Sequence, residues 1–130
     1  MAAFLLDTCV IIDALNGKRG RRVLLLDLVK SGHVLACCPI NISEVYAGMR
    51  PKEKVATEGF LASLQYLPIT RAAARLAGEF KRDYACKGNT LNLGDVIMAA
   101  VAIHDELTLL TDNTKDFPTA DLSLYPLPKV

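Results

Sequence analysis

A short apolar run near the N-terminus, Ala3–Leu6, leads directly into the polar pair Asp7 and Thr8. Because this run is apolar throughout rather than alternating, it is typical of a strand that is buried on both faces of a sheet. The polar pair would then lie at the carboxyl end of the strand, which is the edge where open α/β sheets bind their ligands. Asp and Thr are also common helix caps. This segment alone therefore leaves open whether Asp7 caps a helix or takes part in chemistry.

Apolar runs alternate with helical patterns along the rest of the chain. Strands are expected at His33–Cys38, Tyr66–Ile69, Leu107–Thr111 and Leu122–Tyr125. Helices are expected at Thr8–Leu15, at Val23–Lys30, from Pro39 onward, at Pro51–Leu64, at Arg71–Cys86 and at Leu91–His104. This alternation predicts an α/β fold, a three-layer α/β/α sandwich whose central, mostly parallel sheet has four to five strands. The proline within Tyr66–Ile69 favours an edge position for that strand.

Length and composition fit one domain spanning residues 1–130. The chain is 52% hydrophobic but only 6% aromatic, so an aliphatic core is expected. No segment approaches the ~20 uninterrupted apolar residues of a membrane helix, and no basic region precedes the first apolar run as it does in a signal peptide. We therefore expect a cytoplasmic protein without membrane association. The four cysteines lack the spacing of a zinc or redox motif and are expected to be buried thiols.

The charge pattern argues against a broad basic surface. Fifteen basic and 14 acidic residues give a net charge of +1, so any nucleic-acid binding must rest on local charge. The basic segment 18–22 could contact phosphate backbones, although a solvated loop is the simpler interpretation.

Asp95 stands in a helix that is otherwise apolar on nearly every face, Leu91–His104. A buried carboxylate is costly unless something compensates for it. Two explanations are available. The carboxylate could interact with the helix dipole at the N-terminus, or it could belong to a functional site.

Acidic residues follow strands or begin helices at four places in the chain. They are Asp7, Glu44, Asp95 and one acid of the turn that contains Asp112 and Asp116. In a parallel sheet with right-handed crossovers these positions share one edge. Four carboxylates there would repel one another unless a cation neutralised them, and oxygen donors suit Mg²⁺, with Mn²⁺ as a substitute, better than zinc. Such ions activate water and stabilise a leaving oxygen, which predicts phosphodiester hydrolysis.

Four motifs in this order make the chain resemble the PIN-domain ribonucleases and, within them, the VapC toxins of bacterial toxin–antitoxin modules. The motifs are Leu6–Thr8, Ser43–Gly48, Leu93–Ala100 and Leu110–Phe117. The resemblance covers essentially the whole chain. It implies a Mg²⁺-dependent endoribonuclease that acts on RNA, forms a homodimer and is inhibited by a VapB-type antitoxin.

The predicted metal-binding and catalytic acids are Asp7, Glu44, Asp95 and Asp116, with Thr8, Thr111 and Asn113 as supporting residues. Asp112 is the alternative fourth acid. We favour Asp116, because side-chain alternation directs Asp112 away from Thr111. A helical turn that starts at Asn113 can instead bring Asp116 back over the strand end.

Cys9 departs from the pattern of the resembled family, which usually has Asn two residues after the first Asp. This change could weaken the support of the site or favour Mn²⁺. The same residue argues against a phosphotransferase of the haloacid dehalogenase type, which needs a second Asp at that position. Glycine-rich nucleotide-binding motifs are absent. The remaining alternative is a non-catalytic PIN-like RNA-binding or scaffold protein, and the presence of all four acids argues against it.

Overall fold

The computed structural model describes residues 2–117 and 122–127 of the chain. Within these residues five strands form one sheet in the order β3-β2-β1-β4-β5, and every neighbouring pair is parallel. The strands are β1 (Ala3–Leu6), β2 (Val34–Cys37), β3 (Gln65–Tyr66), β4 (Thr108–Thr111) and β5 (Ser123–Pro126). The predicted α/β fold is confirmed, with five strands in an all-parallel sheet.

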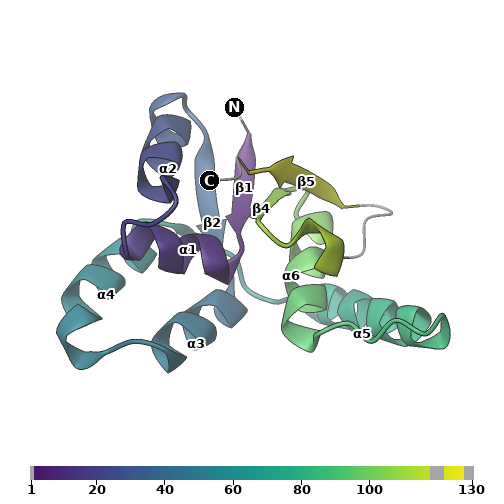
Figure 1. Cartoon of the computed structure of the whole chain (residues 1–130). Coiled ribbons are helices and arrows are strands. Elements are labelled where there is room, and N and C mark those ends of the chain that lie inside the picture. The colour runs from purple at the N-terminus through teal and green to yellow at the C-terminus, as the bar shows by residue number, and fades with distance from the viewer. Residues whose placement is uncertain (1, 118–121, 128–130) are drawn as a thin grey trace.

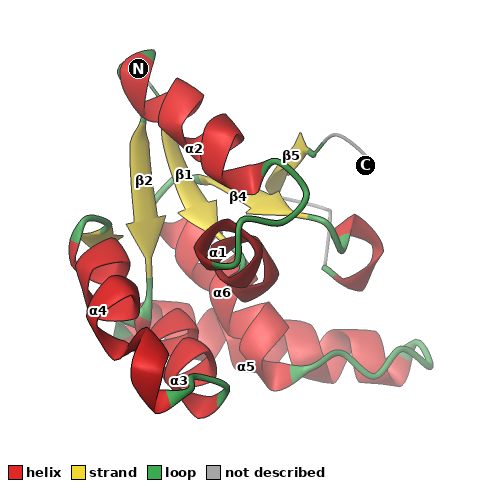
Figure 2. Cartoon of the chain, turned by 60° about the vertical axis from the view of Figure 1, so that its left-hand side comes forward, coloured by secondary structure: helices red, strands yellow, loops and turns green. Residues whose placement is uncertain are grey.

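Helices cover both faces of the sheet (Figure 1). They are α1 (Thr8–Leu15), α2 (Arg21–Lys30), α3 (Pro39–Ala47), α4 (Lys54–Ala62), α5 (Arg71–Cys86) and α6 (Leu93–His104), with 3-10 turns η1 (Pro51–Glu53) and η2 (Thr114–Asp116). Side chains alternate along β1, so Leu5 packs in the layer of α5 and α6. Phe4 and Leu6 pack in the opposite layer with α1, α2 and α4. Figure 2 shows α1 and α2 in front of β1 and α6 behind it.

Two predicted elements differ from the structure for local reasons. The helix expected at Pro51–Leu64 is divided into η1 and α4, and the Glu53 carboxylate accepts the backbone N–H of Arg50 across η1. The strand expected at Tyr66–Ile69 shrinks to the two residues of β3, because Pro68 has no N–H to donate to a ladder. Its predicted edge position is confirmed.

The cysteines differ in burial, contrary to the expectation that all four are buried. Cys37 and Cys38 are buried, whereas Cys9 is partly exposed and Cys86, at the end of α5, is exposed. All four are free thiols.

The strand order changes direction at the centre of the sheet. The chain runs from β1 to β2 on one side, while β4 lies on the other side of β1. The backbone N–H of Asp7 donates to the carbonyl of Leu110 (2.9 Å), so the carboxyl ends of β1 and β4 lie side by side. This is the kind of position where open parallel sheets bind ligands. Among the described residues, no helix is long and apolar enough to cross a membrane.

Candidate active site

Asp7 directly follows β1 and is held by donors from three residues. Its Oδ1 accepts the backbone N–H of Thr8 (2.7 Å), which makes Asp7 the N-cap of α1. Its Oδ2 accepts the hydroxyl of Thr111 (2.6 Å) and the thiol of Cys9 (3.4 Å). Because only 5% of Asp7 is exposed, these bonds fix a buried carboxylate in one orientation. Capping and participation in a site, the two roles left open by the sequence, are therefore compatible.

Glu44 extends from α3 toward the same strand end. Its Oε1 accepts the hydroxyl of Thr8 (2.6 Å). Its Oε2 faces the start of α6, since a Cβ placed on Gly94 would lie 3.6 Å from that oxygen. Thr8 thus links the carboxylates of Asp7 and Glu44, because it donates its backbone N–H to one and its hydroxyl to the other.

Asn41 supports this link and was missed by the sequence analysis. It is fully buried, and its Nδ2 donates to the Thr8 hydroxyl oxygen (3.1 Å) and to the Leu6 carbonyl (3.0 Å). Its Oδ1 accepts the backbone N–H of Cys38 (2.8 Å). A hydroxyl has a single hydrogen, so a Thr8 oxygen that accepts from Asn41 can direct that hydrogen at Glu44. The available signal was a polar residue in the first turn of a predicted helix, as in a capping box.

Asp95 lies in the first turn of α6. The side chain of Asn92 caps this helix, and its Oδ1 accepts the backbone N–H groups of Gly94 (2.8 Å) and Asp95 (3.4 Å). Asp95 is partly buried and sits where the helix dipole favours a negative charge. It is also the next residue after Gly94, which faces Glu44. The start of α6 therefore borders the Glu44 carboxylate, which Thr8 holds.

The turn after β4 brings one supporting residue to Asp7. Thr111 is fully buried, and while it donates its hydroxyl to Asp7 it accepts the backbone N–H of Asn113 (3.0 Å). The turn continues into η2, and the buried ring of Phe117 anchors it in the core. Asp116 is the last residue of η2, but its side chain lies outside the described part of the structure.

Asp112 points toward two arginines. Arg21 donates to its Oδ1 (2.5 Å), and Arg19 approaches its Oδ2 at 3.5 Å. Arg21 begins α2 and is only 2% exposed. The interpretation of segment 18–22 as a solvated loop is therefore wrong for Arg21, whose guanidinium is buried against a carboxylate. The sequence gives no sign of this pair, because its members lie at opposite ends of the chain.

Cys9 is a hydrogen-bond donor beside Asp7. Burial raises the pKa of its thiol to about 12, and the negative charge of Asp7 adds to the rise. The group is therefore a neutral thiol at pH 7. In the metal-free protein it can therefore donate a hydrogen bond to Asp7.

The donor set at this edge fits a hard divalent cation. Asp7 and Glu44 present carboxylate oxygens, which are the ligands that Mg²⁺ and Mn²⁺ prefer. Within the described residues, no three acidic, histidine or cysteine side chains surround one point. The structure thus brings Asp7 and Glu44 together around Thr8, sets Asp95 at the border, and directs Asp112 to Arg21.

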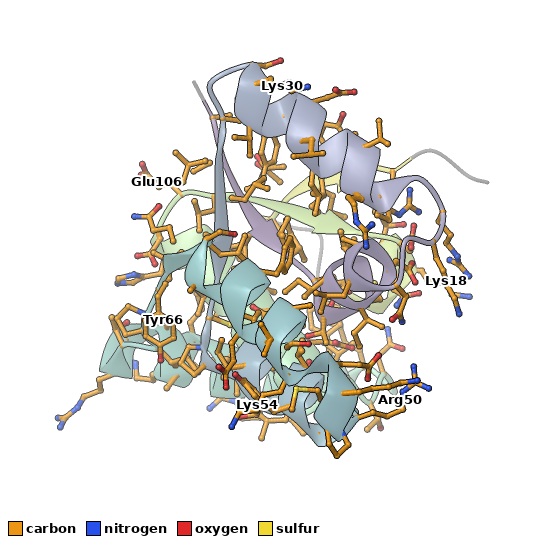
Figure 3. All side chains as sticks on the ribbon, turned by 90° about the vertical axis from the view of Figure 1, so that its left-hand side faces the viewer. Lys18, Lys30, Arg50, Lys54, Tyr66 and Glu106 are labelled. Carbon is orange, nitrogen blue, oxygen red and sulfur yellow. The ribbon has the colours of Figure 1, made fainter. Side chains whose placement is uncertain are left out.

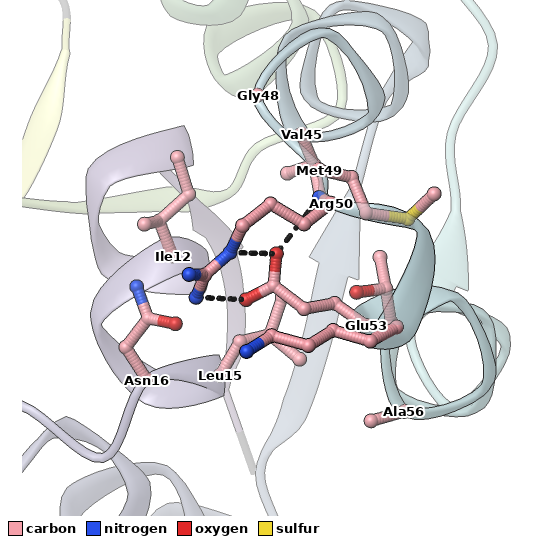
Figure 4. Close-up of a pocket in the computed structure, with 11 residues that line it drawn as sticks. Ile12, Leu15, Asn16, Val45, Gly48, Met49, Arg50, Glu53 and Ala56 are labelled. Atoms are coloured by element: carbon pink, nitrogen blue, oxygen red, sulfur yellow. Dashed lines mark hydrogen bonds and ion pairs between the residues drawn. The ribbon is translucent and has the colours of Figure 1, made fainter.

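An apolar groove of about 850 Å³ lies between α2 and α4, on the face seen in Figure 3. Its apolar walls include Leu25, Leu26, Val29, Phe60 and Leu64. A hollow of about 400 Å³ between α1, α3 and α4 adjoins it (Figure 4), since Leu15 and Ala56 line both. At the wall of this hollow, the guanidinium of Arg50 pairs with the Glu53 carboxylate (3.1 Å).

Comparison with known proteins places these features in a family. The chain matches the family model of the PIN domain over residues 4–121. Ribonuclease VapC10 of Mycobacterium tuberculosis is 36% identical over 114 residues, which cover 88% of this chain and 85% of the relative. Ribonuclease VapC19 of the same organism is 32% identical over 114 residues, covering 88% and 91%.

Solved structures share the fold over nearly the full chain. A chain in the crystal structure of VapBC2 from Rickettsia felis, bound to a DNA fragment from the promoter, superposes with a TM-score of 0.82 at 21% identity, covering 97% of this chain and 99% of that one. A chain of a toxin–antitoxin complex from Klebsiella pneumoniae gives a TM-score of 0.76 at 26% identity, covering 98% and 100%. The chain therefore belongs to the PIN-domain family and, within it, to the VapC-type ribonuclease toxins of toxin–antitoxin systems.

Proposed function

We propose that this VapC-type protein cleaves RNA internally by metal-assisted hydrolysis at the edge where Asp7 and Glu44 meet the start of α6. The observation that carries the proposal is the double link through Thr8, which holds two carboxylates from separate segments at the carboxyl end of β1. PIN nucleases are typically metal-dependent. The oxygen donors suit Mg²⁺, with Mn²⁺ as a substitute.

In this proposal Asp7, Glu44, Asp95 and Asp116 hold the ion. When bound, the ion would polarise a phosphoryl oxygen and lower the pKa of the attacking water. The other residues orient the carboxylates. Thr111 and Cys9 donate to one oxygen of Asp7, and Thr8 donates to one oxygen of Glu44.

We favour Asp116 over Asp112 as the fourth acid. The pairing of Asp112 with Arg21 and Arg19 supports this choice, because a carboxylate engaged by two guanidiniums is a poor metal ligand. The anchoring of η2 by Phe117 also supports it, since a fixed turn can present Asp116 at a constant position.

We further infer that a VapB-type antitoxin binds and inhibits this chain in the cytoplasm. Leu26 and Val29 in the groove between α2 and α4 are 53% and 52% exposed, and an apolar helix of the partner would cover them. The adjoining hollow continues between α1 and α3, the helices that carry Thr8 and Glu44. A basic side chain following the partner's helix could therefore reach the acids. The homodimer implied by the sequence resemblance stays a prediction.

Expression in a bacterial host tests the toxin function and the nuclease together. Induction of the wild-type chain should stop growth and fragment cellular RNA, and co-expression of the small gene adjacent to its own should restore growth. Asp7→Asn, induced to the same level, is the matched control and should leave growth and RNA intact. Normal growth despite RNA fragmentation would remove the toxin role alone. Normal growth with intact RNA would favour the non-catalytic alternative.

A further inference from the structure

A polar hollow of about 320 Å³ opens beside Asp95, between the end of α5 and η2. Besides Asp95, its lining includes Tyr84, Asn89, Asn92 and Lys115. The apolar groove and the hollow between α1, α3 and α4 contain none of the candidate acids in their walls. A molecule in the hollow beside Asp95 would therefore lie next to the proposed reaction site.

Hydrogen bonds hold the walls of this hollow in place. The backbone N–H of Asn89 donates to the Tyr84 carbonyl (2.8 Å), and the Lys81 ammonium donates to the Leu91 carbonyl. The carboxamide of Asn92 is held by the N-terminus of α6. The segment between α5 and α6 is thus tied down at several points, as expected for a largely preformed binding site.

The lining combines the groups that bind a nucleotide. Tyr84 provides an aromatic ring, Asn89 an exposed carboxamide and Lys115 an exposed ammonium. The Nζ of Lys87 lies 5.5 Å from the centroid of the Tyr84 ring, and Lys87 itself is exposed. A surface side chain therefore lies over one face of the ring. Bases of single-stranded RNA stack on such rings and bond to amides, while ammonium groups pair with phosphates.

Electrostatics also require binding groups outside the acidic edge. Asp7, Glu44 and Asp95 repel the phosphates of RNA, and a net charge of +1 provides no general attraction. When no cation neutralises these acids, affinity for RNA must come from cations and stacking surfaces that border them. In the wall that contains Asp95, Lys115 provides a cation and Tyr84 provides a stacking surface.

We propose that this hollow binds one nucleotide of single-stranded RNA next to the scissile phosphate. The base stacks on Tyr84, Asn89 bonds to the base edge, and Lys115 pairs with a phosphate. This inference rests on the proposed function of the acidic edge, because it takes RNA as the substrate and Asp95 as part of the reaction site.

Binding of a fluorescent single-stranded RNA of mixed sequence, measured by anisotropy in EDTA, tests the stacking role without cleavage. Tyr84→Ala should weaken binding by about tenfold or more, as loss of one base-stacking ring does, whereas Tyr84→Phe should bind like the wild type. Tyr66→Ala is the matched control, since Tyr66 is 56% exposed on the edge strand β3 and should not affect RNA affinity. If Tyr84→Ala fails to fold, Tyr84→Leu keeps apolar bulk without the ring and should show the same loss.

The salt dependence of the same binding tests the ammonium. Lys115→Gln should reduce the slope of log affinity against log salt by about 0.7, the change expected for one phosphate contact on a single strand. Lys30→Gln, at the far end of α2, should leave the slope unchanged.

The outcomes separate this inference from the proposed function. If RNA binding depends on Tyr84 but no cleavage occurs in Mg²⁺, nucleotide binding in the hollow is supported and the proposed nuclease function is wrong. If cleavage occurs in Mg²⁺ and the wild type and Tyr84→Ala bind RNA with equal affinity, only the proposal that the hollow binds a nucleotide is wrong. Loss of antitoxin binding by Tyr84→Ala with unchanged RNA affinity would also overturn it, and would assign the surface to a protein partner.

Discussion

Asp95→Asn should abolish RNA cleavage while leaving the metal-free protein at least as stable as the wild type. Asp95 follows Gly94, which faces Glu44, so in the proposed site its removal takes away one of several mutually repelling charges. A lost metal ligand should lower the cleavage rate by at least about a hundredfold, because a bound ion contributes several kcal/mol of transition-state stabilisation. Cleavage rates in Mg²⁺ and thermal unfolding in EDTA measure the two effects.

The matched control for this variant is Asp27→Asn, on the exposed side of α2. Asp27→Asn also removes one negative charge, but at a position away from the site. It should change neither the cleavage rate nor the thermal stability. An Asp95→Asn protein that melts several degrees lower and still cleaves RNA would contradict the prediction. In that case the only role of Asp95 would be its favourable interaction with the dipole of α6.

Asp116→Asn and Asp112→Asn should have opposite effects. Asp116→Asn should abolish cleavage with little loss of stability. Asp112→Asn should keep cleavage but destabilise the fold by on the order of 2 kcal/mol, because it removes a charged partner of the buried Arg21. This estimate is below that for a fully buried pair, since the Asp112 side chain is 21% exposed. In a chain of this size the loss corresponds to a melting temperature lower by roughly 5–10 °C.

Cleavage at several Mg²⁺ concentrations, together with thermal unfolding, distinguishes the two carboxylates. Loss of a ligand raises the Mg²⁺ needed or stops turnover, whereas loss of an ion pair lowers the melting temperature. If Asp112→Asn proves the more damaging to turnover while both variants stay folded, the metal lies nearer the end of β4 than we propose.

Local patterns were enough to predict the fold and the sheet edge where Asp7 lies. The continuous apolar runs identified the parallel strands, and the bounds of α1 and α5 follow from the polar residues that cap them. The position of Asp7 after β1 predicted the edge of the sheet at which the structure places Asp7 and Glu44, because that rule depends on topology and not on details of packing.

The hydrogen-bond network could not be predicted, because it depends on residues that only folding brings together. Asn41 reads as a helix-capping residue, and its contact with Thr8 arises from the pairing of β1 with β2. Arg21 reads as part of a solvated basic segment, and only the packing of α2 beside the turn after β4 buries it against Asp112. Two-residue strands such as β3 also lack a periodic signal, since a period cannot repeat within them.

Cleavage of a single-stranded RNA by the purified protein tests the central claim most directly. Wild-type protein should cut the RNA in Mg²⁺, stop when EDTA is added, and resume when Mn²⁺ is supplied in excess over the EDTA. Asp7→Asn, purified in parallel, should be inactive in all three conditions, which excludes a contaminating nuclease. Undiminished cleavage in EDTA by the wild type, absent from the Asp7→Asn preparation, would show that this edge cleaves RNA without a metal and would contradict the account.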